Sequence, residues 1–420
     1  MEEQIVVGVD IGTTKVCAMV ASSDDIGRIN ILGVGVAPSE GLNRGVVVNI
    51  DKTVEAVHAA IHDAERAAGL SVRQVVVGIA GDHIQSFQSR GVITIREREI
   101  SADDVERLLD DTRHIALPGD RQILHVMPQE FIVDGQDGVT EPIGMRGMRL
   151  EANVHIITGL ISAAQNIYRC IEKTGREVAD IVLEPLASSY AVLHPEEKEI
   201  GVALVDIGGG TTDIAVFEDN MIRHTAVVAV AGNQVTEDIR KGLGIMRNDA
   251  EQLKCQYGVA MPGLVEHDEE ISIPGIPGRH EKIVRRSTLA QIIQPRLEEI
   301  LEIVDQELKR SGYARRLGAG VVLTGGGSLI PGTVELAADV LGLEAREGRA
   351  TGLSGGLVQE VTNPKFATGV GLVLYGLRPE GLSSVPFSLA PDGDRRPLRG
   401  GDRTIRERIR DRMVGWFNEL

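Results

Sequence analysis

The hydrophobic pattern of the chain alternates short apolar runs with glycine-rich turns, which is typical of an α/β protein. Residues 5–9 (IVVGV) and 16–20 (VCAMV) are two β-type runs separated by a tight turn, so they predict a hairpin. Residues 200–205 (IGVALV) and 213–217 (DIAVF) flank a second turn of the same kind. Because one strand–turn–strand pattern occurs twice, we predict two similar halves that arose by duplication.

Two further stretches predict helices. Residues 101–115 predict a short helix inside a segment of strand-like runs that extends from about Asp82 to Gly159. This segment predicts a small α+β insertion. Residues 287–308 predict a long helix with one apolar side, made of Leu289, Ile292, Ile293, Leu297, Ile300, Leu301, Val304 and Leu308.

Composition narrows the class of protein. The formal net charge is −17, which argues against broad nucleic-acid binding, because that function needs a basic surface. Cys17, Cys170 and Cys255 are far apart and lack metal-ligand spacing, so buried free thiols are expected. The N-terminus has acidic residues where a signal peptide needs basic ones, and no run approaches the ~20 apolar residues of a spanning helix. We therefore expect a soluble, cytoplasmic body.

The two predicted turns have the chemistry of a phosphate site. Their sequences are Asp10-Ile-Gly-Thr-Thr-Lys15 and Asp206-Ile-Gly-Gly-Gly-Thr-Thr-Asp213. Glycines let backbone N–H groups approach an anion, and Thr hydroxyls add donors. An aspartate at a strand end can hold Mg²⁺ through water, and Lys15 can offset phosphate charge. The alternative is that each turn only closes a hairpin, which the repetition makes less attractive.

A third glycine-rich segment, residues 320–328 (GVVLTGGGS), predicts a strand that runs into a turn before a helix that begins after Pro331. A flat ligand such as a purine could lie on such a turn. The sequence lacks the pattern G-x-x-x-x-G-K-[ST], so a P-loop is excluded.

In order and spacing, these three segments resemble the phosphate-1, phosphate-2 and adenosine motifs of the actin, heat-shock chaperone and sugar kinase superfamily. The resemblance covers residues 4–377 and implies an actin-like ATPase fold, with two similar halves around a nucleotide cleft. It implies Mg²⁺ at Asp10 and Asp206, and catalytic roles for Asp206 and for Glu184, which would position the attacking water. Gly232 and the E-x-x-K helix at residues 250–254 would complete the site. The nucleotide-binding residues would be Gly12, Thr13, Thr14, Lys15, Gly208, Gly209, Gly210, Thr211, Thr212, Gly232, Glu251, Lys254, Gly325, Gly326, Gly327 and Ser328.

Within that superfamily the chain resembles the FtsA family of bacterial cell-division actin homologues. The features are the insertion, the segment Val182-Leu-Glu-Pro-Leu-Ala-Ser-Ser-Tyr190 and an amphipathic C-terminus. The resemblance implies six parts: subdomain 1A (residues 1–82 and 160–197), an inserted 1C (83–159), 2A (198–233 and 306–377), 2B (234–305), a flexible linker (378–403) and an amphipathic helix (404–420).

Membership would imply an ATP-binding protein that polymerises on the inner face of the cytoplasmic membrane and tethers FtsZ at the division septum. ATP used as a structural switch and slow ATP hydrolysis both stay open. The FtsZ C-terminal peptide would bind on 2B, where Arg285, Arg286 and Arg296 are candidate contacts; a solvated basic face is the alternative. The insertion would make filament contacts and meet later division proteins, or be a plain decoration.

The C-terminal segment carries the chain's single tryptophan. Residues 378–403 are rich in Pro, Gly and polar residues and predict a flexible linker. After it, arginines surround a set of apolar residues that share one helical face. These apolar residues are Ile405, Ile409, Met413, Trp416, Phe417 and Leu420. Three interpretations compete: a helix docked on the body, a partner-binding peptide, and a helix in the interface of an anionic membrane. The long linker weakens the first, and the FtsA resemblance favours the third.

Two other functions fit the same motifs. A small-molecule kinase of the superfamily would need a substrate pocket between the halves and no lipid-binding tail. A type IV pilus assembly protein of the PilM kind would bind a peptide of a membrane protein instead of FtsZ.

Overall fold

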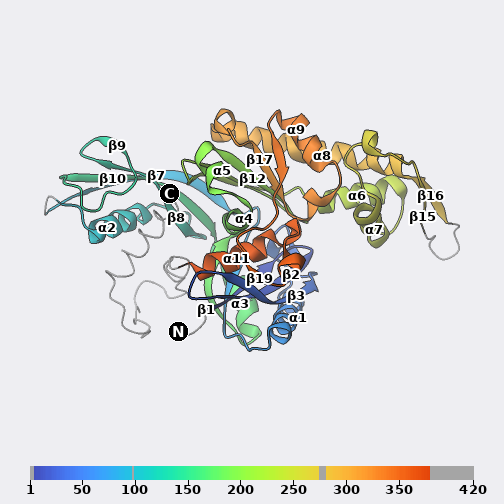
Figure 1. The fold of residues 1–420 in the computed structure, drawn as a ribbon, viewed down its shortest axis with the longest axis horizontal. Helices are drawn as coiled ribbons and strands as arrows, with labels where there is room; N and C mark the ends of the chain where they lie inside the picture. Colours follow the sequence, from blue (N-terminus) through green and yellow to red (C-terminus); the bar gives the residue numbers. More distant parts are fainter. Residues whose placement is uncertain (1–3, 97–98, 274–280, 379–420) are drawn as a thin grey trace.

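Two mixed sheets, one in each half, form the centre of the molecule (Figure 1). The structure is a computed structural model that describes residues 4–96, 99–273 and 281–378. The first sheet contains, in spatial order, β11 (Glu177–Leu183), β6 (Gln74–Ile79), β1 (Gln4–Ile11), β2 (Lys15–Ser23), β3 (Ile29–Pro38) and β19 (Gly355–Gly356). The second contains β14 (Met221–Val228), β13 (Thr212–Glu218), β12 (Val202–Ile207), β17 (Val321–Thr324) and β18 (Ala345–Glu347). A short ribbon in the first half pairs β4 (Leu42–Asn43) with β5 (Val46–Val47).

The predicted hairpins are confirmed. β1 pairs with β2 and β12 pairs with β13, both antiparallel, and the two registers match: Asp10 lies opposite Cys17, and Asp206 lies opposite Asp213. β1 and β12 also pair in parallel with β6 and β17, respectively. Each hairpin therefore presents its turn at the edge of its sheet where the first strand ends.

Helices pack on these sheets and bring the two halves together. Those of the first half are α1 (Ile50–Ala68), α3 (Ile161–Lys173), α4 (Glu184–Val192) and α11 (Ala367–Leu377). Those of the second are α5 (Pro195–Ile200) and α9 (Thr333–Leu341), with 3₁₀ turns η2 (Ala314–Arg316) and η3 (Gly326–Leu329). α10 (Val358–Val361) and η4 (Pro364–Phe366) follow β19, and their Val361 and Phe366 are buried in the same core as β1 and β2. A Cβ at Gly371 of α11 would lie 1.9 Å from the Ala187 carbonyl oxygen of α4. Only glycine permits the two helices to cross this closely. The crossing sets the position of α4 and therefore of Glu184, its first residue.

The insertion forms its own small domain at one end of the molecule, at the left in Figure 1. Its sheet has the order β7 (Gln85–Thr94), β10 (Arg149–Leu160), β8 (Arg121–Val133) and β9 (Gln136–Val139). The predicted helix is α2 (Ala102–Arg113), which Ser101 and Asp104 begin with a capping box. Leu108, Leu150 and Ile156 are fully buried in a core separate from those of the two halves.

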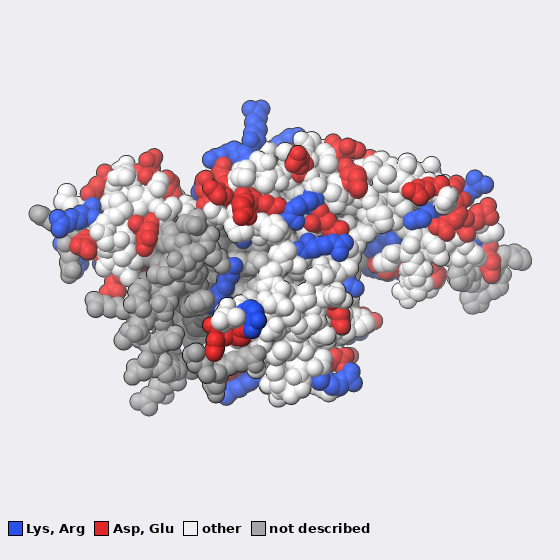
Figure 2. Space-filling view, viewed as in Figure 1, with Lys and Arg blue, Asp and Glu red and all other residues white. Residues whose placement is uncertain are grey.

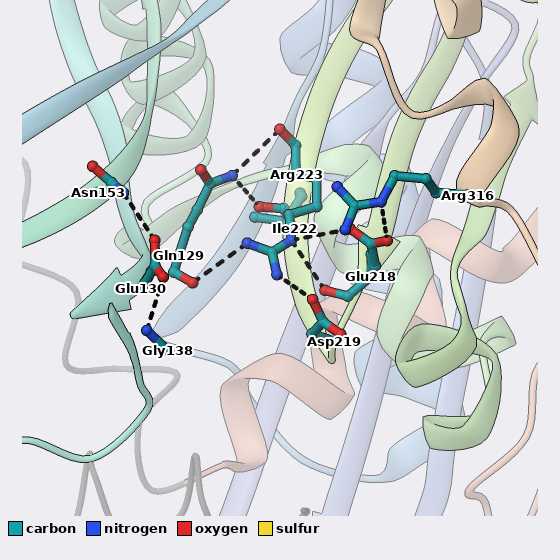
Figure 3. A network of polar contacts seen from close by, with 9 residues as sticks. All are labelled: Gln129, Glu130, Gly138, Asn153, Glu218, Asp219, Ile222, Arg223 and Arg316. Carbon is teal, nitrogen blue, oxygen red and sulfur yellow. Dashed lines mark hydrogen bonds and ion pairs between the residues drawn. The ribbon is translucent and has the colours of Figure 1, made fainter. Parts of the chain in front are cut away.

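The inserted domain also contacts the second half through β14 (Figure 3). The Gln129 amide of β8 donates to the carbonyl oxygens of Ile222 at 2.7 Å and Arg223 at 3.3 Å. The Ser86 hydroxyl donates to the Thr225 carbonyl at 2.8 Å, and the buried His155 ring bonds the Thr225 hydroxyl at 3.0 Å. β14 pairs with β13, which is the second strand of the phosphate-2 hairpin. The inserted domain therefore contacts the strand next to this hairpin.

A small subdomain lies at the opposite end of the molecule, at the right in Figure 1. It contains α6 (Gly232–Leu243), α7 (Arg247–Tyr257), η1 (Pro262–Leu264), β15 (Glu270–Ile273), β16 (Lys282–Arg285) and the long α8 (Arg286–Ser311). The predicted long helix is confirmed as α8, and its apolar side is buried except Ile292, which is partly exposed. Acidic and basic side chains are mixed over the visible face of the molecule (Figure 2).

The subdomain boundaries given above stay predictions. The predicted linker beyond Arg378 and the amphipathic helix at 404–420 lie outside the described residues. Within the described part of the chain, none of the helices has the length and apolar character that a membrane crossing requires.

Candidate nucleotide-binding site

The two glycine turns have the same local geometry. Each turn has four residues between its last paired positions, Gly12–Lys15 and Gly208–Thr211. In the first, the Gly12 N–H donates to the Lys15 carbonyl at 2.9 Å; in the second, the Gly208 N–H donates to the Thr211 carbonyl at 2.9 Å. Lys15 and Thr211 therefore occupy equivalent positions, one with an ammonium group and the other with a hydroxyl.

The two turns face each other across the junction of the halves. A Cβ on Gly209 would lie 2.3 Å from Cγ2 of Thr14, and a Cβ on Gly210 would lie 2.5 Å from Oγ1 of Thr13. Side chains at these positions would push the turns apart, so glycine is required by the contact itself. The contact brings the N–H groups and hydroxyls of both turns to the same junction, as a clamp on phosphates requires.

Four carboxyl groups gather at this junction. Asp10, Asp206 and Asp213 are buried, and the partly buried Glu184 lies within electrostatic reach of all three. Lys15 Nζ contacts Asp10 Oδ2 at 2.8 Å. The Ser188 hydroxyl donates to Asp206 Oδ2 at 3.0 Å. Asp213 Oδ2 accepts from Thr211 at 2.9 Å, whereas its Oδ1 is buried with no hydrogen-bond partner among the described residues.

Burial and mutual repulsion disfavour the charged forms of these acids. Burial raises the pKa of the Asp206 carboxyl to about 6, and burial together with the Asp206 charge raises the pKa of Asp213 to about 8. Burial and the three aspartates raise the pKa of Glu184 well above its ordinary value. Burial opposes ionisation of Lys15 too, but the Asp10 carboxylate raises the pKa of its ammonium group overall. The cluster thus has four acidic side chains and one ammonium group, that of Lys15, so a further cation would be favourable there.

The third glycine-rich segment and the E-x-x-K helix, α7, also lie at this junction. Gly325, with φ of 84°, leaves so little room that a Cβ would lie 2.3 Å from Asp206 Oδ1. At Gly326 a Cβ would meet nothing within 4 Å, so this position faces open space. Lys254 Nζ of α7 donates to the Gly232 carbonyl at 3.2 Å and contacts Glu251 Oε2 at 2.8 Å. Although burial opposes it, Lys254 lowers the pKa of Glu251.

These residues fit ATP with Mg²⁺. In the part of the chain that the structure describes, no group of three or more His, Cys, Asp or Glu residues is arranged to ligate a metal directly. Mg²⁺ does not need such a group, because it keeps several waters and takes phosphate oxygens as ligands. Asp10 and Asp206, one from each half, together with the unpartnered Asp213 oxygen, are suited to a hydrated divalent cation.

Sequence reasoning missed three side chains of this site. Asp213 was part of the second motif but received no role, although the hairpin register places it opposite Asp206. That register could have been read from the spacing, since a four-residue turn pairs positions 206 and 213. Ser188 and Thr368, which approach Asp206 from α4 and α11, come from segments distant in sequence, and their hydroxyls carry no local signal.

The three predicted FtsZ-peptide contacts do not lie at the junction. Arg285 lies 3.8 Å from Asp268, Arg286 lies 3.2 Å from Glu269, and Arg296 lies 2.5 Å from Asp238 and also contacts Glu299. All three arginines lie on the small subdomain, and each is paired with an acid, so they form no purely basic face. The predicted membrane-binding residues Ile405, Ile409, Met413, Trp416, Phe417 and Leu420 lie outside the described residues.

Comparisons with known proteins decide between the predicted alternatives. The family model of cell division protein FtsA matches residues 203–371, and the model of the SHS2 domain inserted in FtsA matches residues 81–158. The cell division protein FtsA of Pseudomonas aeruginosa is 46% identical over 375 residues, which are 89% of this chain and 90% of that protein. The FtsA of Escherichia coli K12 is 38% identical over 382 residues, 89% and 91% of the two chains.

The chain belongs to the FtsA family of cell division proteins. This confirms the predicted resemblance and favours FtsA over the pilus and kinase alternatives. Solved structures confirm the actin-like fold. The PilM–PilN type IV pilus biogenesis complex matches with a TM-score of 0.65 and 17% identity, covering 89% of this chain and 98% of that one. MreB5 of Spiroplasma citri bound to ADP matches with a TM-score of 0.52 and 16% identity, covering 88% and 94%.

Proposed function

We propose that this FtsA-family protein binds ATP with Mg²⁺ between its glycine turns, forms filaments on the inner face of the cytoplasmic membrane, and tethers FtsZ there at the division septum. The observation that carries the proposal is the contact between the turns, Gly209 against Thr14 and Gly210 against Thr13, beside buried aspartates from both halves. Family membership supports the role in cell division.

The proposed roles in the cleft follow from the chemistry of each group. Backbone N–H groups of both turns and Lys15 would hold phosphate oxygens. Asp10 and Asp206 would hold Mg²⁺ through waters, and the bound metal would offset phosphate charge. Glu184, whose raised pKa reflects burial beside three aspartates, would position a water. Residues 325–328 would face the purine, and Glu251 with Lys254 would face the ribose. Such a site serves a slow ATPase or a nucleotide-dependent switch.

The proposed membrane anchor is the amphipathic segment 404–420. Burying a large apolar side chain completely contributes roughly 1.5–3 kcal/mol to the free energy of binding. A helix in the membrane interface buries its six large apolar side chains only in part. Ordering the helix costs free energy as well, so one copy binds weakly and reversibly. Many copies on one filament bind tightly, because every further contact is intramolecular. Self-association and membrane binding should therefore reinforce each other.

The proposed partners bind at the two ends of the molecule. The FtsZ C-terminal peptide would bind the small subdomain near Arg285, Arg286 and Arg296, whose acidic partners would have to yield to the peptide. The inserted domain would contact neighbouring subunits and later division proteins. Its separate core and sheet support a domain that can present its own surface.

Co-flotation with vesicles tests the tether. Anionic vesicles are mixed with FtsZ, Mg-ATP and either the full chain or a chain that lacks residues 404–420. FtsZ should float only with the full chain, while ATP binding, measured by equilibrium dialysis, stays equal in both. FtsZ that floats equally with the truncated chain would contradict the anchor. Full-length protein that floats without FtsZ would contradict the tether and leave the anchor standing.

A further inference from the structure

A second cavity lies apart from the nucleotide site, where the inserted domain meets both halves. Its volume is about 430 Å³, within the range of protein ligand sites. Its apolar wall comes from β8 of the inserted domain, α4 of the first half and β14 of the second, through Met127, Pro128, Leu186, Tyr190, Met221 and Ile222. None of the predicted nucleotide-binding residues lines it.

Hydrogen bonds between the inserted domain and β14 hold the wall of this cavity in shape (Figure 3). The Gln129 amide donates to the Ile222 carbonyl at 2.7 Å, and Arg223 pairs with Asp219 at 2.6 Å and donates to the Gln129 carbonyl at 3.4 Å. Ile222 and Asp219 line the cavity themselves, and Gln129 follows the lining Pro128. Three parts of the fold are thus joined around a preformed apolar space.

One edge of β8 next to the cavity is suited to an extended occupant. β10 pairs with β8 along its whole length on one side, from Arg121 to Val133. On the other side β9 pairs only from Phe131 onward. Among the described residues, the part of β8 that contains Val126, Met127 and Pro128 therefore has no strand partner on its second edge. An extended chain can lie against such an edge and place alternate side chains in a neighbouring pocket.

The chain itself supplies a segment of this kind within reach. Arg378, the last described residue, lines the cavity, and its guanidinium lies 4.1 Å from the Tyr190 ring centre. Seven residues further on, Val385-Pro-Phe-Ser-Leu389 alternates apolar and small residues. In extended form Val385, Phe387 and Leu389 share one face. Seven extended residues span up to about 25 Å, so the segment can return to the cavity beside which the chain leaves.

The charges near the segment also match the cavity. Two basic residues, Lys198 and Arg378, and one acidic residue, Asp219, line it. Asp392 and Asp394 follow the apolar segment in the sequence. The amphipathic segment 404–420 is a poorer occupant, because a 17-residue helix is about 25 Å long and its six large side chains need a long groove.

We propose that Val385, Phe387 and Leu389 dock in this cavity in extended form. The linker then acts as a strap that holds the inserted domain to both halves. It also shortens the free tether from residues 378–403 to residues 390–403. For flexible chains of these lengths the mean span falls from about 28 Å to about 20 Å. If the proposed membrane anchor holds, docking sets how far the body stands from the lipid.

Disulfide trapping in the full chain tests the docking. Met127→Cys is combined with Phe387→Cys in a Cys255→Ser background, since Cys255 is exposed whereas Cys17 and Cys170 are buried. Mild oxidation should give a fast intramolecular crosslink. The matched control keeps both cysteines and adds Val385→Ser and Leu389→Ser, which leaves the chain length unchanged. We expect this control to crosslink at least about tenfold more slowly.

Three outcomes would overturn the proposal. Equal rates in the pair and its control would mean that the apolar segment does not drive the contact. A crosslink that appears only between two molecules would assign the cavity to a second copy. No crosslink at Met127 would count against docking, provided that Thr140→Cys, a second and exposed position on the cavity, gives none with Phe387→Cys either. None of these outcomes depends on ATP or on lipid.

Discussion

At the scale of single residues, the main feature of the site is that its buried carboxyl groups have few basic partners. Lys15 pairs with Asp10, and hydroxyl groups serve Asp206, but Asp213 keeps one buried oxygen without a described partner. A buried carboxylate without compensation is unstable as an anion. Its ionised form becomes favourable beside a divalent cation, so binding of the cation should displace the proton that Asp213 holds in the nucleotide-free site.

The Asp213 carboxyl predicts how stability depends on pH. Its pKa is raised from 3.8 to about 8 by burial and by Asp206. Between these values the folded state binds a proton that the unfolded state lacks, so nucleotide-free stability should fall as pH rises from about 4 to about 8 and then level off. Asp213→Asn removes this titration. We expect the variant to lose less stability than the wild type between pH 5 and pH 8.5, by on the order of 1 kcal/mol or more.

Urea unfolding of the nucleotide-free protein at the two pH values measures this difference. Asp137→Asn, at an exposed position of β9, is the control and should follow the wild type. A variant at position 213 whose pH dependence equals that of the wild type would show that this carboxyl does not titrate between those values. Asp206 should leave a residual slope in the same direction, since burial raises its pKa to about 6.

At the scale of elements, β14 connects the inserted domain to the cleft. It pairs with β13, which carries Thr212 and Asp213, and its outer side receives Gln129, Ser86 and His155. Burial lowers the pKa of His155 to about 4, so this ring is neutral near pH 7 and adds no charge to the contact. A shift of the inserted domain would therefore also move a strand next to the phosphate-2 hairpin.

Gln129→Ala is predicted to loosen this connection. The substitution removes the donor to the Ile222 and Arg223 carbonyls, and leaving a buried acceptor unpaired costs about 1–3 kcal/mol. The free energy of unfolding should drop by about that much, and amide exchange should quicken along β14. Gln136→Ala, at an exposed position of β9, should change neither. Exchange in β14 that stays at the wild-type rate would mean that other contacts carry the connection.

The elements also show what sequence could and could not predict. Both hairpins, α2 and α8 follow from local apolar period and turn residues, and these predictions hold. The repeated motif also predicted that the turns would act together. What it could not give was the approach of Ser188 and Thr368 to Asp206, or the cavity between β8, α4 and β14, because these depend on packing between segments far apart in the chain.

At the scale of the whole molecule, the proposed function requires that the cleft and the C-terminal anchor be linked. The two halves meet at glycine turns too close for a side chain, so a nucleotide held by both turns favours one relative position of the halves. If that position is the one that assembles into filaments, ATP gathers many weak anchors into a tight attachment. Trp416 lies in the proposed anchor and is the only tryptophan, so its emission reports the anchor alone.

We predict that anionic vesicles shift the Trp416 emission to the blue, and that Mg-ATP enlarges the shift at a fixed protein concentration. Gly209→Ala would put a Cβ 2.3 Å from Thr14 and hold the turns apart, so this variant should bind vesicles but lose the ATP effect. Gly119→Ala, where a Cβ would meet nothing within 4 Å, should keep the ATP effect.

A shift of equal size with and without ATP in the unaltered protein would leave the anchor in place and refute its link to the cleft. An emission that is blue before lipid is added and does not move would mean that Trp416 is packed on the body, and the anchor itself would then be wrong.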